Sequence, residues 1–420
     1  MKKNETKTYT DLTTLLVMST AYIAVFSSVQ GFKAMLPLIR DDFGLSGAQA
    51  GLYSTFFYSS GVLLAVFSGR VVDAIGARKG LIGGVLIVAS LMVLHTVVPT
   101  FTILLGLAVL SGIGFSVVTP SINKGIIEQV SSDKRAVSNG IVHAGGGIGG
   151  VLGASLLPFI GERFGWRLGI LISAGLAFLM AVLLFQMFYP RNNNGTHEET
   201  SRSFKEDLAM VVKNPLVWMV TLVGISVGLS LGNVTIHYTL FLTGDLAYSP
   251  TLAGIALSLF MVGGIIGNPL FGYVNDRFLN SNRRHSLFTL LLVLAGLFFY
   301  LGNVMIESDM PFILVAVSTL VLGMVAFASM GMMFTTLGDV AGPRLMGTAT
   351  GFMLVFIRLS VVITPPLLGY LADVSGNYRL SWTVIAFSLV GLSTLFFILT
   401  RSHKHLLRRE ESTYQAPYHS

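Results

Sequence analysis

The sequence predicts an all-α polytopic membrane protein whose twelve transmembrane helices form two pseudo-symmetric bundles of six. Of its 420 residues, 53% are hydrophobic and only 11% are charged, whereas soluble domains carry about 25% charged residues. Apolar runs of about 20 residues, long enough to cross a bilayer, recur along the chain. Gly69 and Asp73 recur 203 positions later as Gly272 and Asp276. Composition and run length therefore indicate a membrane protein, and the repeat indicates two related halves.

The repeat keeps one register over a long stretch. Gly51 and Gly61 recur as Gly254 and Gly264, again 203 positions later and without a gap. Each half is therefore expected to contain six helices, over the ranges 12–37, 47–70, 79–98, 101–128, 136–160 and 166–189, then 215–243, 250–274, 286–305, 311–338, 345–371 and 380–400. The expected domains are an amino-terminal bundle over 1–189, a cytoplasmic linker over 190–214, a second bundle over 215–400 and a cytoplasmic tail over 401–420.

The boundaries follow from the residues between the apolar runs. The first run, from about Leu12 to Leu38, follows a polar stretch and is longer than a signal-peptide core, so we expect it to remain as the first helix. Midway along the chain the polar stretch Pro190–Asn214 interrupts the apolar pattern, which is typical of a linker. After Thr400 the chain becomes basic and then polar, and this change ends the last helix.

The distribution of lysine and arginine predicts the orientation. With the amino terminus in the cytoplasm, most of the 27 basic residues fall in cytoplasmic loops and tails, as the positive-inside rule requires. The outer loops keep only Arg40, Arg163, Arg167 and Arg379. Both termini are therefore expected in the cytoplasm, and the net charge of +7 reflects topology rather than a nucleic-acid partner. The absence of cysteine excludes disulfides and thiol chemistry, and we expect no cofactor and no metal.

Short motifs flank several of the expected helices. The loop after the second helix contains Gly69, Asp73, Gly76, Arg78 and Lys79, and its copy after the eighth contains Asp276 followed by Arg277. Asp133-Lys134-Arg135-Ala136 precedes the fifth helix, and Gly165-Trp166-Arg167 precedes the sixth. Together with the twelve helices and the central linker, these motifs resemble the major facilitator superfamily of secondary transporters over about residues 12–400. The loop departs from the family signature at Ala74, where arginine is usual.

The resemblance implies that the two loops act as conformational latches between the halves. The residues concerned are Gly69, Asp73, Gly76, Arg78, Asp276 and Arg277. A carboxylate at this position can accept charge-assisted hydrogen bonds or face the amino end of a neighbouring helix. The alternative explanation is a tight turn whose charges only set the topology.

Ionisable side chains within the expected spans are few, and such groups are costly at membrane depth and usually functional. The substrate-binding candidates are three basic residues and their polar or aromatic neighbours, namely Arg358, Lys124, Lys33, Asn123, Tyr22, Gln30, Asn233 and His237. The candidates for proton coupling are His143, His237 and Glu128. Because no carboxylate lies at the same central depth, we expect the site to favour an anion, which guanidinium holds at two points and ammonium as a point charge.

Several of these candidates also have a structural explanation. Lys33 and Lys124 could extend to the membrane surfaces, and the two histidines could be packing residues. The glycine run Ala144–Gly153 lacks the ending of a phosphate-binding loop and a preceding strand, so it is expected to allow close helix contact. It also partly resembles the glycine-rich motif of drug–proton antiporters. Superposing the halves at Gly140 and Gly351, 211 positions apart, sets Arg358 opposite Gly147.

The pattern favours a secondary transporter that moves a small organic or inorganic anion by alternating access, with a proton as the coupling ion. The resemblance to the anion–cation symporter and organic-acid branches of the superfamily supports symport. The alternative is a multidrug–proton antiporter, whose central site usually contains a carboxylate. No arrangement of residues typical of an enzyme is present. We expect a monomer in the lipid bilayer of the plasma membrane, in a bacterium the inner membrane.

Overall fold

The structure is a computed structural model, and it describes residues 2–130, 134–188, 204–278, 283–307 and 310–401. All the regular secondary structure in these ranges is helical, which confirms the predicted all-α class. Eleven of the described helical segments are long and apolar enough to cross a membrane. Large apolar side chains are exposed over much of the outer surface, as a surface in contact with lipid requires. The chain is a multi-pass membrane protein.

The described residues of the first half form seven helices. Its elements are α1 (Lys2–Ala34), α2 (Leu36–Phe43), α3 (Gly47–Ile75), α4 (Ala77–His95), α5 (Phe101–Gln129), α6 (Arg135–Phe164) and α7 (Trp166–Met187). The first helix was predicted to run over 12–37, but in the structure it ends at Ala34. The chain breaks at Met35 and continues as α2. Pro37 explains the break, since its ring cannot donate a backbone hydrogen bond and clashes with the preceding turn of a continuous helix.

A short helix, α8, lies within the predicted linker and precedes the helices of the second half. The elements are α8 (Phe204–Lys213), α9 (Pro215–Gly244), α10 (Pro250–Phe278), α11 (Arg283–Tyr300), the π-turn η1 (Leu301–Met305), α12 (Phe312–Ser375) and α13 (Arg379–Leu399). Gly342 divides α12 into the two predicted spans, with a φ of 73° that glycine adopts at no steric cost. Residues 190–203 of the linker and the tail after Arg401 lie outside the described residues.

Glycine allows a close helix contact in the first half between α1 and α6. A Cβ atom on Gly149 would lie 2.3 Å from the carbonyl oxygen of Ile23, and one on Gly153 would lie 2.2 Å from that of Ser27. These distances are far below van der Waals contact, and both contacts are with backbone, which cannot rotate away. The glycine run therefore provides close helix packing, as predicted from the sequence.

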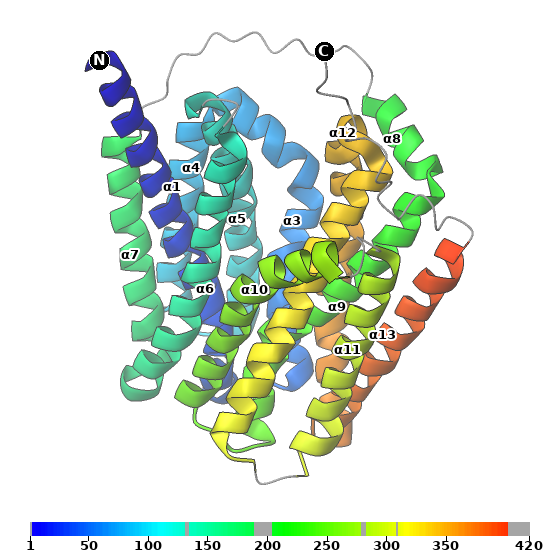
Figure 1. Cartoon of the computed structure of the whole chain (residues 1–420). Coiled ribbons are helices and arrows are strands. Elements are labelled where there is room, and N and C mark those ends of the chain that lie inside the picture. The colour runs from blue at the N-terminus through cyan, green and yellow to red at the C-terminus, as the bar shows by residue number, and fades with distance from the viewer. Residues whose placement is uncertain (1, 131–133, 189–203, 279–282, 308–309, 402–420) are drawn as a thin grey trace.

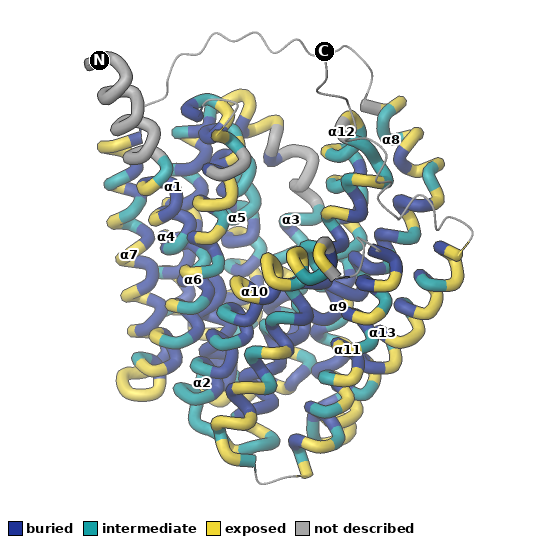
Figure 2. The backbone as a smooth tube through the Cα atoms, in the orientation of Figure 1, coloured by how far each residue is buried: buried dark blue, intermediate teal, exposed yellow. Residues whose placement is uncertain are grey.

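The two halves meet at one end of the molecule and diverge at the other (Figure 1). Across the boundary α3 packs against α12, and α6 packs against α10. The end where the halves diverge carries the start of α1 and helix α8, and we call it the α8 end. The opposite end, where the halves meet, carries α2, and we call it the α2 end (Figure 2). The charge distribution predicts that the α8 end faces the cytoplasm.

We expect Gly153→Ala to destabilise the protein, because the added methyl group collides with the α1 backbone. Overpacking of this kind costs about 1–3 kcal/mol. The measurement is thermal unfolding of the purified protein in detergent. Gly140→Ala on the same helix is the matched control, since a Cβ atom there meets nothing within 4 Å. Equal melting temperatures for the two variants would contradict the packing argument.

Candidate functional site

A basic residue from each half lies beside the same stretch of α3. Lys33 on α1 is 1% exposed, and its Nζ donates a hydrogen bond to the Tyr58 hydroxyl at 2.7 Å. Arg358 on α12 donates from Nη1 to the carbonyl oxygen of Gly61 at 2.5 Å, and its guanidinium also interacts electrostatically with the Tyr58 phenol. Tyr58 and Gly61 are three residues apart, so α3 holds a cation of each half on neighbouring turns.

Neither cation is neutralised by an acid in the part of the chain that the structure describes. The ion pairs found there involve other basic residues, and none includes Lys33 or Arg358. Buried charges in proteins are usually paired, because an unpaired charge in a low-dielectric interior is costly. The pair therefore forms a strongly positive region, and an anion is the ligand that this region attracts.

Aromatic and polar residues of the first half form a second group. Tyr22 on α1 lies edge-on to the His143 ring, with 5.3 Å between the ring centroids, and its hydroxyl is 3.4 Å from the Thr119 hydroxyl. The His143 Nε2 is 3.2 Å from the Asn123 Oδ1 and donates to it. Asn123 is exposed and His143 is half-buried, so both can be reached. Three predicted site residues, on α1, α5 and α6, are thus brought together.

Lys124 lies away from the Lys33–Arg358 pair. Its Nζ donates to the Asp73 carboxylate at 3.0 Å and to the Asp73 carbonyl oxygen at 3.1 Å. Asp73 is fifteen residues beyond Tyr58 on α3, which is about 22 Å at 1.5 Å per residue. Glu128 interacts electrostatically with both Lys124 and Asp73. The prediction placed Lys124 beside the other two cations, whereas the structure places it in an acidic cluster at the α8 end.

The polar residues of α9 are held inside the second half. His237 is 1% exposed, and its Nε2 donates to the Pro365 carbonyl oxygen at 2.8 Å, while Nδ1 accepts from the Tyr378 hydroxyl at 3.1 Å. Asn233 is fully buried and donates to the Thr364 hydroxyl at 2.7 Å. Both side chains join α9 to α12. This geometry favours a packing role, so the structure does not bring these two predicted ligands to the Lys33–Arg358 pair.

The remaining predicted residues have local partners or lie outside the described side chains. Gln30 is 8% exposed on α1, and its Cγ is 3.8 Å from the Cβ position of Gly150 on α6. Gly76 has a φ of 85° and separates α3 from α4. Arg78 donates to the Phe185 carbonyl oxygen and lies over the Phe185 ring. Of the other latch residues, Arg277 is exposed, Gly69 lies within α3, and the Asp276 side chain is not among those described.

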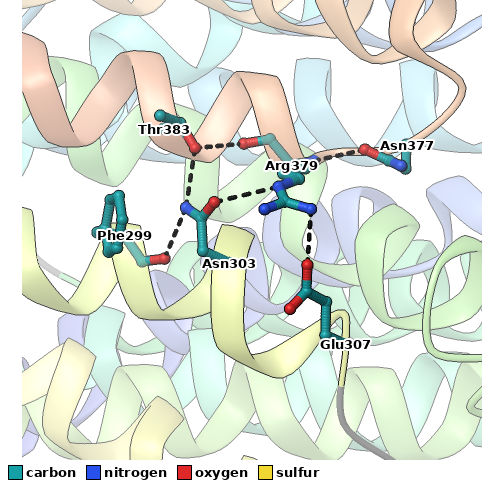
Figure 3. Close-up of polar contacts among 6 residues, drawn as sticks. All are labelled: Phe299, Asn303, Glu307, Asn377, Arg379 and Thr383. Carbon is teal, nitrogen blue, oxygen red and sulfur yellow. Dashed lines mark hydrogen bonds and ion pairs between the residues drawn. The ribbon is translucent and has the colours of Figure 1, made fainter.

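The α2 end carries polar contacts within and between the halves. Inside the second half, Asn303 on the π-turn accepts from Arg379 at 3.1 Å and donates to Thr383 at 3.0 Å. Arg379 also pairs with Glu307 at 2.7 Å (Figure 3). Between the halves, Arg40 faces Asp245. Burial raises the pKa of the Asp245 carboxyl, while the Tyr378 N–H and the charge of Arg40 oppose that shift.

Tyr58 is the site residue that sequence reasoning missed. It lies in a run rich in aromatic and hydroxyl side chains with Tyr53 and Phe57, where a tyrosine is indistinguishable from a packing residue. The repeat register contains a weak signal, because position 58 corresponds to position 261 in the second half, where the residue is Met261. Met261 lies against Gly150 on the other side of the boundary between the halves. The two positions that the repeat relates therefore both lie at the boundary between the halves.

Comparisons with known proteins agree with the fold described above. The profile of the Major Facilitator Superfamily matches twice, over residues 18–243 and 220–418. The chain is 24% identical to a probable sulfoacetate transporter of Cupriavidus necator, covering 90% of this chain and 91% of that protein. It is 22% identical to a hexuronate transporter of Bacillus subtilis, covering 81% and 83%. A crystal structure of a bacterial homolog of the human lysosomal transporter Spinster, inward-facing and occupied, has a TM-score of 0.74 at 18% identity, covering 94% and 96%.

We expect His237→Ala to lower the melting temperature markedly, because it leaves the buried Tyr378 hydroxyl without its acceptor and removes the hydrogen bond that joins α9 to the Pro365 carbonyl of α12. Each buried group left unsatisfied costs about 1–3 kcal/mol. Thermal unfolding in detergent measures the loss. His143→Ala is the control, since this half-buried ring has one hydrogen-bond partner and its removal should change the melting temperature little. A stable His237→Ala protein in which only the pH dependence of transport has changed would return His237 to the coupling candidates.

Proposed function

Because the chain belongs to the Major Facilitator Superfamily, and is therefore a membrane transporter rather than an enzyme, we propose that it carries a small organic anion across the plasma membrane by alternating access. The observation that supports this most directly is the pair Lys33 and Arg358. One buried or half-buried cation comes from each half, and no described acid neutralises either. Secondary transporters bind their substrate near the bilayer midplane between the repeats, and Arg358 lies near the middle of the span Arg344–Ser375.

The chemistry of the two cations explains how an anion would be held. The guanidinium of Arg358 has five donors in a planar fork and suits a carboxylate or sulfonate at two points. The ammonium of Lys33 adds a compact charge, and Tyr58 fixes its position. A ligand held by both cations touches both halves at once. Its binding therefore favours one relative position of the two halves over another, as alternating access requires.

The names of the relatives support the same class of substrate. The two relatives described above are named for sulfoacetate and for hexuronate, and both are small organic anions. We propose a carboxylate, a sugar acid or a similar anion for this chain, with a proton as the coupling ion and a monomer as the transporting unit. His143 is the coupling candidate that lies in the accessible Tyr22 group, and Glu128 lies in the cluster with Lys124 and Asp73.

The proposal is tested by uptake into proteoliposomes with an imposed pH gradient. The panel contains labelled carboxylates, sugar acids, sulfonates, nitrate and phosphate esters, together with lipophilic cations. We expect at least one anion to accumulate with the proton gradient. Movement of lipophilic cations alone would instead support a multidrug–proton antiporter.

Arg358→Ala is expected to abolish anion uptake, and Arg358→Lys should restore little of it because a point charge cannot replace two-point binding. Uptake is compared at equal amounts of folded protein, judged by size-exclusion profile and melting temperature. Arg163→Ala is the control, since Arg163 is an exposed arginine at the α2 end that lies over Phe159. Transport at the wild-type level in Arg358→Ala would remove Arg358 from the site.

Tyr58→Phe should weaken substrate binding while preserving the fold. The change removes only the hydroxyl that accepts from Lys33, and a hydrogen bond to a charged group contributes about 1.5–3 kcal/mol. We expect the KM for the anion to rise more than tenfold, with a smaller change in maximal rate. Tyr370→Phe, at an exposed tyrosine, provides the comparison. Identical uptake curves for the two variants would show that Tyr58 does not position Lys33 for binding.

A further inference from the structure

A carboxylate from the second half caps a helix of the first half at the α2 end. Asp373, near the end of α12, accepts from the backbone N–H of Gly47 at 2.6 Å and of Ala48 at 2.9 Å. These are the first two residues of α3, whose N–H groups have no partner within the helix. An anion at a helix amino terminus also interacts favourably with the helix dipole. Both oxygens of Asp373 therefore bind across the boundary between the halves.

The reverse contact exists on the other side of the boundary. Glu162, near the end of α6, accepts through Oε2 from the backbone N–H of Thr251 at 3.0 Å and from its hydroxyl at 2.5 Å. Thr251 is the second residue of α10. Here the first half supplies the carboxylate and the second half supplies the helix start.

The two contacts are related by the internal repeat. Asp373 and Glu162 are 211 positions apart, the separation that superposes α6 on the second part of α12, and each lies three residues before a C-cap glycine of positive φ. Ala48 and Thr251 are 203 positions apart, the separation that superposes α3 on α10. A chance surface contact would have no reason to recur under both separations.

The backbone contacts beside the carboxylates repeat in the same way. A Cβ atom on Gly51 would lie 2.6 Å from the Pro365 backbone, and one on Gly254 would lie 2.4 Å from the Ala154 carbonyl oxygen. Gly51 and Gly254 are related by 203 positions, and Ala154 and Pro365 by 211. At both places the two halves are in backbone contact, so the carboxylates close an interface that is already tightly packed.

We propose that Asp373 and Glu162 form a pair of equivalent locks that hold the α2 end closed, and that both must release before this end can open. Each lock joins one half to the other with two hydrogen bonds to a charged group. Two other acids of this end act within a single half, because Asp42 bonds to Trp166 and Arg167 within the first half and Glu307 bonds to Arg379 within the second. The proposal concerns the conformational equilibrium, so it goes beyond the choice of substrate.

The test measures distances between spin labels in the full-length protein. The chain has no cysteine, so labels can be introduced without other changes. Asp41→Cys and Leu380→Cys place labels on exposed residues of the two halves at the α2 end, and Lys79→Cys and Tyr273→Cys do so at the α8 end. Electron–electron double resonance is recorded in lipid nanodiscs for the wild type and for Asp373→Asn, Glu162→Gln and the double variant.

We expect each neutral variant to increase the population with a longer α2-end distance about fivefold, since loss of a favourable charge at a helix terminus costs about 1 kcal/mol. The double variant should show the larger shift, accompanied by a shorter distance at the α8 end. Asp42→Asn and Glu307→Gln remove the same charge from the same end and should leave both distributions unchanged. Melting temperatures identify any variant that has unfolded.

Two outcomes would overturn the proposal. One is a double variant that is folded and has the wild-type distance distributions. The other is an equal shift in the Asp42→Asn and Glu307→Gln controls, which would assign the effect to the net charge of the surface. The readout does not depend on transport, so a failure to find an anionic substrate leaves this result interpretable.

Discussion

The central constraint on this molecule is that two cations of different halves share one stretch of α3, and no acid among the residues that the structure describes neutralises them. In a medium of low dielectric constant, charges of like sign on neighbouring turns repel strongly unless an anion joins them. The Tyr58 hydroxyl partly stabilises this arrangement by accepting a hydrogen bond from Lys33, and the Gly61 carbonyl oxygen accepts one from Arg358. Neither group carries a full negative charge.

Charged groups of the protein are sorted by depth. At the α8 end three acids pair with Lys124, Arg283 and Arg344. At the α2 end two acids accept from helix starts, and two others pair with Arg167 and Arg379. The middle of the bundle keeps the cations Lys33 and Arg358. Since the described acids that form ion pairs lie near the two ends of the bundle, the positive centre is a property of the charge distribution and does not depend on one residue.

The fold could be predicted from the sequence because apolar run length and the repeat register report directly on membrane-spanning helices. Arg358 and Lys33 could be identified because ionisable residues within such runs are rare. Lys124 could not be placed, since its distance from the membrane surface depends on where α5 ends and on Asp73, a partner far away in the chain. Tyr58 was missed as a site residue, whereas His237 was predicted as a ligand and has packing contacts instead, and both have the same cause. A polar residue in an apolar helix gives no sign in the sequence of whether it faces a neighbouring helix or the boundary between the halves.

The crossed pattern of contacts at the α2 end has a consequence for the origin of the chain. Each half gives one carboxylate and receives one, so a single half would leave an acid without a partner and N–H groups at a helix start without their acceptor. Two identical copies of a six-helix ancestor, related by a twofold axis, would satisfy both contacts at once, as isologous dimer interfaces do. Fusion of the two copies would then preserve an interface that had already existed between separate subunits.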